Sequence, residues 1–311
     1  MGRPLVATVI VNWNTAELLE GVLGNLAEHL PANAPVVVVD NDSADDSVDR
    51  VESGFPEVTV VQMGENAGFC RANNAGIRAV DSEYVLLINT DARLTDGCLD
   101  GMLSVFEREP RCAIVGPRLT FADGSFQRWT AGRLPTVAST ANYYLFLDRF
   151  SNRIPALGSV YIAHDTDQPG PVGWVSSAVM MIRRDALDEF GLMDEDIFLY
   201  MDDVDLCQRA HEAGWSTWYA ADQTAVHFMN GTSTKVLGTA SPEAARSANR
   251  WFTRQHGRSA GVAMRATQAA GFGVRGAAHG AVGVLTRDQE RTRLARAHWN
   301  QVRICTETPD V

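Results

Sequence analysis

Residues 85–91 read Val-Leu-Leu-Ile-Asn-Thr-Asp, an apolar run of strand length that ends in three polar residues. Such a run is typical of a buried strand in a parallel sheet, and its polar end would lie at the carboxyl edge of that sheet. Asn89, Thr90 and Asp91 could there present oxygen ligands to Mg²⁺ or Mn²⁺, which bind through one or two carboxylates together with substrate phosphates. Alternatively, Asp91 caps a helix that begins near Thr95, or closes a turn.

The chain around this stretch alternates between apolar runs of strand length and segments with helical periodicity. Strands are expected at 5–12, 36–39, 58–61 and 84–88. This alternation predicts an α/β fold with a mostly parallel, doubly wound sheet. Asn12 and Asp40 follow two of the other strands, so with Asn89 they should meet along one edge of the sheet, where ligands bind in open α/β folds.

The rest of the chain is expected to complete this domain and then to form a helical extension. We expect helices at 95–108, 185–190 and 203–213, strands at 112–119, 178–182, 217–221 and 225–228, and loops with short helices at 128–171. A long helical segment should begin at Pro242. The predicted domains are residues 1–240, with halves 1–120 and 121–240, and an Arg-rich helical extension over 241–311.

The composition is that of a globular protein with a full core. Of the 311 residues, 45% are hydrophobic and 21% are charged, which is ordinary for such proteins. The five cysteines are scattered and form no Cys-x-x-Cys pair. This argues against a disulfide framework or a zinc site and suits a reducing cytoplasm. The sequence shows neither a basic leader nor a long apolar run, so we expect no signal peptide and no membrane span.

The net charge of −11 conceals an asymmetry. Residues 244–311 carry eleven arginines and four acids, a balance of +7, so residues 1–243 carry −18. An acidic body is a poor nucleic-acid binder, because phosphate contacts dominate that affinity. Arginines recur every fourth residue from Arg246 to Arg258. They could dock on anionic lipid or on a polyprenyl diphosphate, or they could form a solvated face that pairs with the acidic body.

A carboxylate after the second strand could read a nucleotide base. Asp40 is followed by Asn41, Asp42 and Ser43. Its oxygens could accept a hydrogen bond from N3–H of a uracil or thymine ring. Asp42 or Ser43 could instead cap the helix that follows. Both interpretations can hold together, because they use different residues.

The stretch at 66–76 combines a tight turn with an asparagine-rich helix. Asn66 and Gly68 suit a turn into a helix whose N-terminus could face a phosphate or a ribose. Asn73 and Asn74 have low helix propensity. They are therefore expected either to point into a polar cleft or to be exposed at the surface.

Residues 200–205 read Tyr-Met-Asp-Asp-Val-Asp and form the most unusual stretch of the chain. Acids at a helix start complement the helix dipole, which explains one or two of them. Adjacent carboxylates also raise at least one pKa when they are partly buried, which suits a general base. Asp205 stands four residues before Arg209, and we expect these two side chains to pair.

Two single residues are further candidates for a site. Trp174 could stack on a sugar ring from an exposed position in a cleft, or it could pack in the core. His227 ends a short strand before a glycine turn. This position suits a metal ligand, although a lone histidine is more often structural.

Together these stretches resemble glycosyltransferase family 2, the inverting enzymes of GT-A fold, and most closely its bacterial rhamnosyltransferases. The similarity runs from about residue 6 to 233. The matching pieces, in the order of the family, are 9–14, 39–43, 66–69 with 73–74, 89–91, 123–125, 173–176, 183–184, 200–206 and 226–227. Each piece is weak alone, but their common order is a strong signal.

The resemblance implies a role for each matching residue. Asp40 would read the pyrimidine, Asp203 would be the catalytic base, and Asp91 would bind a divalent cation, Mg²⁺ or Mn²⁺. His227 would be a further ligand of the metal or the diphosphate. The nucleotide sugar would be contacted by Asn12, Asn14, Asn66, Asn74, Asn89 and Thr90. The acceptor or the transferred sugar would be contacted by Trp174 and Asp202.

The sequence departs from the family pattern at three points. Asn89 replaces the first Asp of the metal motif, which is expected to weaken metal affinity. The acidic pair, often Glu-Asp, is Asp202-Asp203 here. The Gly-Ala that follows the tryptophan segment in the family becomes Ser177-Ala178, which is expected to crowd the acceptor side.

The resemblance implies metal-assisted single displacement with inversion. The expected donor is dTDP-L-rhamnose, with a UDP-sugar as the alternative, and the acceptor is a saccharide, a polyprenyl-diphosphate-linked sugar or a small molecule. The enzyme would be cytoplasmic, or peripheral on the inner face of the plasma membrane. It could be a monomer or a homodimer. A non-catalytic sugar-nucleotide-binding protein is a second reading. A sugar-nucleotide pyrophosphorylase is disfavoured, because the first strand leads into Asn-Trp-Asn-Thr at 12–15 and not into a Gly-rich basic loop.

Overall fold

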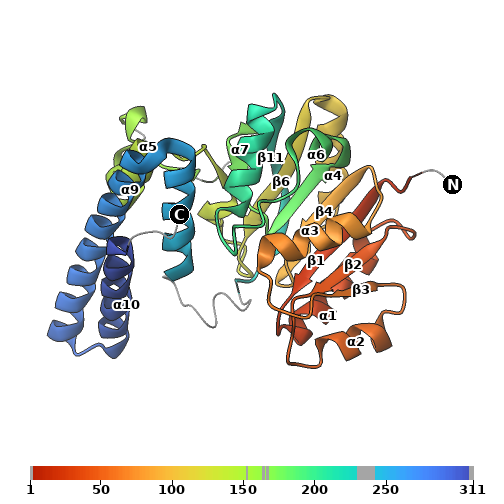
Figure 1. Cartoon of the computed structure of the whole chain (residues 1–311), viewed down its shortest axis with the longest axis horizontal. Helices are drawn as coiled ribbons and strands as arrows, with labels where there is room; N and C mark the ends of the chain where they lie inside the picture. Colours follow the sequence, from red (N-terminus) through yellow and green to blue (C-terminus); the bar gives the residue numbers. More distant parts are fainter. Residues whose placement is uncertain (1–2, 152, 163–164, 166–167, 230–241, 308–311) are drawn as a thin grey trace. The chain divides into compact units, whose positions relative to one another are not determined.

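The chain divides into two units in the computed structural model, which describes residues 3–151, 153–162, 165, 168–229 and 242–307. The sheet unit comprises Met1–Leu134, His164–Phe198 and Asp202–Lys235 (Figure 1). The helical unit comprises Pro135–Ala163, Leu199–Met201 and Val236–Val311. An α/β body followed by C-terminal helices is the architecture that the sequence predicts.

The sheet unit is built on a nine-stranded sheet of order β3-β2-β1-β4-β10-β6-β11-β5, with β8 paired to β11. Its strands are β1 (Val6–Asn12), β2 (Val36–Asp40), β3 (Thr59–Gln62), β4 (Tyr84–Ile88), β5 (Ala92–Leu94), β6 (Cys112–Thr120), β8 (Gly170–Val172), β10 (Val179–Arg183) and β11 (Ser216–His227). The strands from β3 to β4 run parallel, as expected. Local sequence patterns did not predict that β10 lies antiparallel between β4 and β6.

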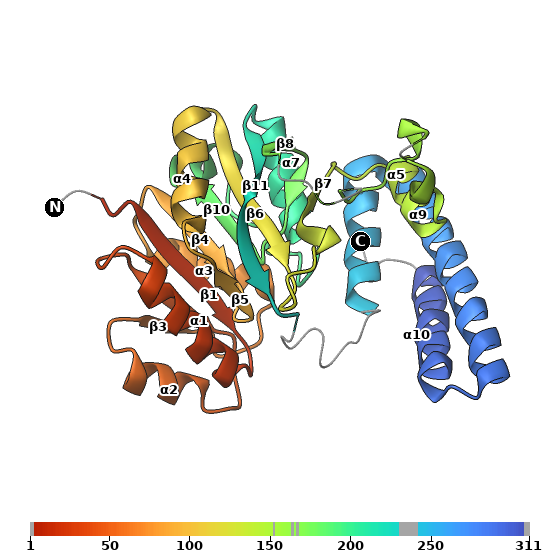
Figure 2. The same ribbon diagram turned by 180° about the vertical axis from the view of Figure 1, so that it is seen from behind.

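Helices cover both faces of this sheet, so its central strands are buried on two sides. They are α1 (Ala16–His29), α2 (Ser47–Gly54), α3 (Phe69–Ala79), α4 (Cys98–Arg108), α6 (Arg184–Phe190) and α7 (Asp202–Glu212). One face carries α3, α6 and α7, and the reverse view shows α1, α2 and α4 on the other (Figures 1 and 2). All five residues of β4 are buried, which is why this strand reads as an unbroken apolar run. The helix α3, which connects β3 to β4, packs closely on the sheet because Gly76 has no Cβ. A Cβ at this position would lie 2.3 Å from the Val9 side chain.

The structure differs from the expected elements at three points. The two short strands predicted at 217–221 and 225–228 are one strand, β11, whose register against β6 shifts between Ala220 and Thr224. The three-residue strand β5 follows Asp91 directly and pairs with the end of β11. Because α4 begins only at Cys98, after Gly97, Asp91 does not cap that helix.

The helical unit contains the two C-terminal helices α9 (Pro242–Thr286) and α10 (Gln289–Thr306). An earlier part of the chain also belongs to it, with α5 (Val137–Tyr144) and the 3-10 turns η2 (Leu147–Phe150) and η3 (Pro155–Leu157). Tyr144 of α5 lies edge-on to Phe272 of α9, with ring centroids 5.3 Å apart. Arg275 lies over Phe146 at 4.1 Å and donates to the Tyr144 carbonyl. These contacts group residues 135–163 with the C-terminal helices, which the sequence did not indicate.

The arginine stripe expected on one face of the C-terminal helix is interrupted. Gly257 has φ 84° and ψ 171°, so α9 consists of two helical segments that meet there, and Arg258 begins the second segment. Arg246 pairs with Glu243 and Glu307, and Arg250 pairs with Glu243 at 2.9 Å. Two of the four arginines are therefore engaged within the helical unit itself.

The five cysteines are free and buried, as the absence of a disulfide pattern predicts. No helix among the described residues has the length and the apolar content that a membrane span requires.

Candidate active site

The carboxyl ends of the central parallel strands are tied together by their polar residues. Asn12 and Asp40 are register partners at the ends of β1 and β2. Asn12 Nδ2 donates to Asp40 Oδ1 and to Ser43 Oγ, both at 2.9 Å. The Thr15 hydroxyl lies 2.7 Å from Asn12 Oδ1 and 3.1 Å from Thr90 Oγ1. The expected meeting of these residues along one edge is confirmed.

Ser43 organises the loop after β2 instead of capping a helix. Its backbone N–H donates to Asp40 Oδ2 at 3.0 Å, and its hydroxyl accepts from the Asn14 backbone N–H at 2.9 Å. Asn14, an exposed residue with φ 55°, accepts from the Ala44 N–H through its Oδ1. Because α2 begins at Ser47, after Asp46, the expectation that Asp42 or Ser43 caps it is wrong.

A polar depression of about 320 Å³ opens at the ends of β2 and β3. Its lining comprises Asp40, Asp42, Ser43, Asp45, Val48, Asp49, Glu52, Gln62 and Gly64. Carboxylates accept hydrogen bonds from imide and hydroxyl groups but repel phosphates. The depression therefore suits the nucleoside part of a ligand better than a diphosphate.

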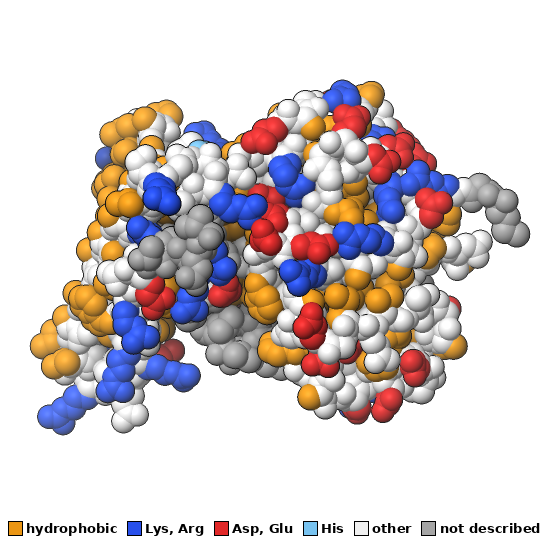
Figure 3. Space-filling model, viewed as in Figure 1, with side chains coloured by type: hydrophobic (Ala, Val, Ile, Leu, Met, Phe, Trp, Pro, Cys, Tyr) orange, Lys and Arg blue, Asp and Glu red, His pale blue; other side chains and the backbone are white. Residues whose placement is uncertain are grey.

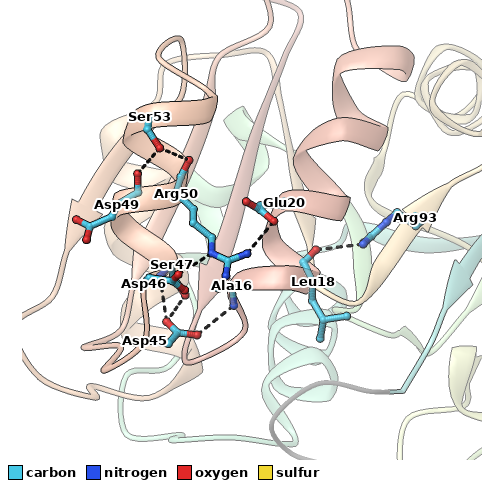
Figure 4. A network of polar contacts seen from close by, with 10 residues as sticks. All are labelled: Ala16, Leu18, Glu20, Asp45, Asp46, Ser47, Asp49, Arg50, Ser53 and Arg93. Atoms are coloured by element: carbon cyan, nitrogen blue, oxygen red, sulfur yellow. Dashed lines mark hydrogen bonds and ion pairs between the residues drawn. The ribbon is translucent and has the colours of Figure 1, made fainter.

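A network of polar contacts braces the two helices beside this edge (Figure 4). Arg50 of α2 reaches Glu20 of α1 at 3.1 Å and Asp46 at 2.9 Å. Asp45 accepts from the backbone N–H of Ala16, the first residue of α1, at 3.1 Å. The start of α1 and the loop after β2 are thereby fixed to each other.

Arg93 holds the segment around Asp91 against α1. Its guanidinium donates to the carbonyl of Leu18 at 3.1 Å (Figure 4). It also donates to the carbonyl of Thr90 at 2.9 Å. Burial lowers the pKa of Arg93, whereas the charge of Asp91 raises it. Gly21 makes room for this arrangement, because a Cβ there would lie 2.2 Å from the guanidinium. The sequence alone did not identify Arg93 as part of the site.

Asp91 and His227, which are 136 positions apart in the chain, meet at this edge. His227 Nε2 lies 3.3 Å from Asp91 Oδ1, and both side chains are largely buried. The pairing of β5 with β11 brings them together, and the Phe228 backbone N–H donates to the Asp91 carbonyl at 2.9 Å.

Gln127 determines how the His227 ring is presented. Gln127 Nε2 donates to the carbonyls of Thr120 and His227, so its Oε1 is left as an acceptor 3.0 Å from His227 Nδ1. This partner set assigns the proton to Nδ1. In the neutral ring, Nε2 then presents a lone pair toward Asp91. Gln127 is 1% exposed, and its isolated position in the sequence carries no signal that could have revealed this role.

The Asp91 and His227 pair has the chemistry of a partial cation site. A carboxylate oxygen and an imidazole nitrogen, both electron-pair donors, repel each other at this distance unless a proton or a metal ion lies between them. A metal-binding histidine almost always donates its other ring N–H to an acceptor, which fixes the tautomer and the orientation of the ring. Within the described ranges, no group of three or more His, Cys, Asp or Glu side chains could hold a metal ion. The donor set therefore fits an ion that also takes ligands from a substrate.

The acidic pair lies at the start of α7 and is connected to the same edge. Ser177 Oγ donates to Asp202 Oδ2 at 2.7 Å. The next residue, Ala178, accepts from the Asn89 backbone N–H at 2.9 Å. The loop before β10 thus links the end of β4 to the acidic pair, so Ser177 anchors Asp202 in addition to occupying space.

The two acids of the pair differ in environment. Asp202 is 5% exposed, whereas Asp203 is more accessible and accepts from the Val204 N–H at 2.8 Å. Burial raises the pKa of Asp203 well above its usual range, and the charge of Asp202 raises it further. Burial also raises the pKa of Asp202, while the Ser177 hydroxyl lowers it. A raised pKa near an accessible surface suits a general base. The expected i,i+4 pair of Asp205 with Arg209 is confirmed at 2.8 Å.

The residues before the acidic pair adopt an uncommon backbone conformation. Tyr200 and Met201 have φ 64° and 65°, a left-handed conformation that costs non-glycine residues roughly 1–2 kcal/mol each. Such conformations cluster at functional sites. These two residues form the turn that leads directly into α7, so the carboxylates at the start of α7 follow Tyr200 and Met201 without a linker.

The turn at Asn66 is built by a residue that the sequence did not single out. Asn41 is 3% exposed, donates to Asn66 Oδ1 at 2.9 Å and accepts from the Ala67 N–H at 2.9 Å. The turn then contacts the loop that leads toward α7, because the Phe69 N–H donates to the Phe198 carbonyl at 2.7 Å.

Two expectations of solvent access are wrong. Asn73 and Asn74 are buried; Asn74 Nδ2 donates to the Met193 carbonyl and to Glu195, and its Oδ1 accepts from the Met193 N–H. Its amide is therefore occupied in holding the 193–195 loop. Trp174 is 4% exposed, in a short strand β9 (Trp174–Val175) that pairs with β7 (Ala131–Gly132). Packing in the core, the alternative reading, accounts for this ring.

Comparisons with known proteins show which proteins this chain resembles. A family model described as "Glycosyltransferase like family 2" matches residues 3–258. The N-acetylglucosaminyl-diphospho-decaprenol L-rhamnosyltransferase of Mycobacterium tuberculosis is 28% identical over 235 residues, covering 72% of this chain and 76% of that protein. The dTDP-rhamnosyl transferase RfbF of Shigella flexneri is 23% identical, covering 75% of this chain and 72% of that protein.

A solved structure confirms the fold. The mannosyltransferase PcManGT from Pyrobaculum calidifontis, in complex with GDP-Man and Mn²⁺, aligns with a TM-score of 0.57 over 98% of this chain and 89% of that protein. At 17% sequence identity this likeness concerns the fold alone. The GT-A fold expected from the sequence is thereby confirmed.

Proposed function

This chain belongs to glycosyltransferase family 2, and from that premise we propose that it transfers L-rhamnose from dTDP-L-rhamnose to a hydroxyl group with inversion. The observation that carries the proposal is one continuous edge of the sheet. There the Asp91–His227 pair and the Asp202-Asp203 pair are connected through Asn89, Ala178 and Ser177. The relatives named for rhamnosyl transfer support the choice of sugar.

The nucleoside end of the donor is assigned to the depression after β2 and β3. Asp40 keeps unused lone pairs on both oxygens after accepting from Asn12 and Ser43. It could accept from the N3–H of thymine, and equally from that of uracil, so a UDP-sugar is the alternative donor. The neighbouring carboxylates suit ribose or deoxyribose hydroxyls. They would repel the diphosphate, which the cation proposed at Asp91 would attract.

Asp91 and His227 are the residues proposed to hold a divalent cation, Mg²⁺ or Mn²⁺. Such an ion, when bound with the donor, offsets the charge that grows on the departing nucleoside diphosphate. Asn89 and Thr90 directly precede Asp91 and would contact the diphosphate or the sugar. Arg93 holds the Thr90 carbonyl and so keeps this segment in position.

Asp203 is the proposed general base. Its carboxylate would accept the proton of the acceptor hydroxyl while the acceptor oxygen forms the new bond to the anomeric carbon. The bond from that carbon to the diphosphate oxygen breaks on the opposite side, so the configuration inverts. Asp202, buried and bound to Ser177, lies beside Asp203 and helps to raise the pKa of this base.

The acceptor is proposed to be a lipid-linked saccharide. The name of the Mycobacterium tuberculosis relative specifies an acceptor of this kind, N-acetylglucosaminyl-diphospho-decaprenol. The experiment is a donor panel of dTDP-L-rhamnose, UDP-glucose and GDP-mannose, with and without Mn²⁺, tested for donor hydrolysis and for transfer to a short polyprenyl-diphosphate N-acetylglucosamine.

Metal-dependent turnover of dTDP-L-rhamnose that Asp203→Asn abolishes is the expected result. Preference for UDP-glucose would shift the donor assignment to the alternative. Tight dTDP binding without turnover of any donor by the wild-type chain would instead identify a non-catalytic nucleotide-sugar-binding protein.

A further inference from the structure

The second segment of α9, after Gly257, presents an outward face without charge. Between Ser259 and Thr286, where every residue is described, no exposed position carries a charged side chain. The face includes Val262 (55% exposed), Val274 (57%) and Leu285 (83%), with alanines between them. A helix that faces water ordinarily carries polar residues on its outer side. This face is therefore built to meet something other than water.

The spacing of these residues shows that they share one side of the helix. Val262, Ala266 and Val274 are separated by multiples of four residues, and Ala277 and Val284 continue the same side at 3.6 residues per turn. The opposite side packs in the unit, where Gln268 is fully buried. Hydrophobic side chains gather along the α9 side of the helical unit (Figure 3).

The same pair of helices is strongly basic. Residues 258–306 contain eight arginines and two acids, Asp288 and Glu290, which gives a net charge of +6. Six of the arginines are exposed: Arg258, Arg287, Arg291, Arg293, Arg296 and Arg303. Within the described part of the chain, none of the six forms an ion pair with a carboxylate. Basic side chains project near the end at which the two helices meet (Figure 3).

Charge decides which occupant fits this face. A second copy of the chain would bring another unit of +6 against the first, and like charges oppose such a contact. A bilayer with anionic headgroups offers apolar depth and negative charge together, as in-plane amphipathic helices require. Since no described helix could cross a membrane, contact would be with the surface.

We propose that the outward face of α9 after Gly257, together with the exposed arginines of α10, docks on an anionic phospholipid bilayer. Leu285 and Val284, at the end of α9, would enter the headgroup boundary. Arg287, Arg293 and Arg296 would contact the phosphates. The surface uses no residue of the transfer site, so this proposal is tested without measuring activity.

The test is flotation of the full chain with vesicles of phosphatidylcholine alone and of phosphatidylcholine mixed with phosphatidylglycerol. The wild type should bind only the mixed vesicles, and high salt should release it. Val274→Asp with Leu285→Asp should weaken binding more than about tenfold. Arg293→Gln and Arg296→Gln should each weaken it about fivefold. The matched control is Leu5→Asp, which places the same change at an exposed leucine (47%) of the sheet unit and should bind as the wild type does.

Each other outcome would overturn the proposal. The variant with Val274→Asp and Leu285→Asp could retain binding while circular dichroism shows intact helices. That result would mean that charge alone, and not the apolar face, mediates contact with lipid. Equal binding to neutral vesicles would remove the role of the arginines. A third outcome is that the wild type binds no vesicles and that light scattering shows a dimer which Leu285→Asp dissociates. That outcome would assign the face to a second copy of the chain.

Discussion

Replacing Gln127 by leucine should weaken metal binding without removing a metal ligand. In the wild type, Gln127 Oε1 lies 3.0 Å from His227 Nδ1, and its Nε2 donates to the carbonyls of Thr120 and His227. Leucine keeps the volume but none of these bonds. The Nδ1 proton loses its acceptor, so the His227 ring is free to rotate and to place its proton on Nε2, the atom that faces Asp91.

The structure sets the size of this effect. Loss of the acceptor that orients a metal-binding histidine typically lowers metal affinity about 10–100-fold, which corresponds to roughly 1.4–2.7 kcal/mol. The two carbonyls that lose a donor add a separate cost to folding, on the order of 1 kcal/mol for each lost bond. The two effects are distinguishable, because one appears in metal affinity and the other in the urea midpoint.

The assay is a titration of Mn²⁺ in the presence of saturating dTDP, followed by calorimetry or by water proton relaxation. The control is Gln268→Leu, which removes an equally buried amide that contacts Tyr144 in the helical unit. It should lower stability but leave metal affinity unchanged. In the complex with Mg²⁺ and dTDP, ¹⁵N spectra should place the His227 proton on Nδ1 in the wild type and on both nitrogens in Gln127→Leu. An unchanged Mn²⁺ affinity in Gln127→Leu, or a wild-type proton on Nε2, would refute this reasoning.

Three further substitutions test the acidic pair and the turn at residues 66–68, and a fourth, Gly64→Ala, is the control. Asp203→Asn should lower turnover about 10²–10⁴-fold. The pKa of Asp203 is raised in the folded state. The free energy of unfolding of the wild type therefore falls as pH rises from about 3.9 through the pKa of the folded state. Asp203→Asn should have a higher melting temperature than the wild type at alkaline pH and the same melting temperature in acid. Ser177→Ala should cost about 1.5–3 kcal/mol of unfolding free energy where Asp202 is ionised, and less in acid; a pH-independent cost in urea titrations would contradict the bond. Gly68→Ala should cost roughly 2–4 kcal/mol, because φ is +87° and a Cβ would meet a carbonyl at 2.9 Å. Gly64→Ala, at φ +72° with open space, should cost about 1–2 kcal/mol; equal losses would refute the steric argument.

The sequence predicted the strands of the parallel half well, because their burial on both faces leaves continuous apolar runs. Val85 to Ile88 is such a run, and all of β4 is buried. The polar ends of β1, β2 and β4 were also predicted to meet, since parallel strands end at one edge. Local pattern could not show that Ala92–Leu94 pairs with the end of β11, because a three-residue strand depends on a partner far along the chain.

Side-chain environment was the harder part of the prediction. Asn74 and Trp174 carry polar or aromatic groups that suit a ligand, yet both are buried. The reason is that Asn74 satisfies a loop backbone 119 residues away, and no local pattern reports such a partner. The same limit hid Gln127 and Arg93. Each acts through backbone carbonyls, which every residue possesses and which no motif identifies.

The charges of the site argue for joint binding of ion and donor. Asp91, Asp202 and Asp203 bring three carboxylates to a connected edge, while Arg93 donates to carbonyls behind it. A diphosphate alone would be repelled by these carboxylates. An ion alone would find, among the described residues, only the two proposed ligands, Asp91 and His227. Each partner supplies what the other lacks, so their affinities should be coupled and reciprocal. Asn89 fits this logic: an amide in place of a carboxylate lowers the affinity for a free ion and also the repulsion of the diphosphate, which makes the site depend on the ion and the nucleotide together.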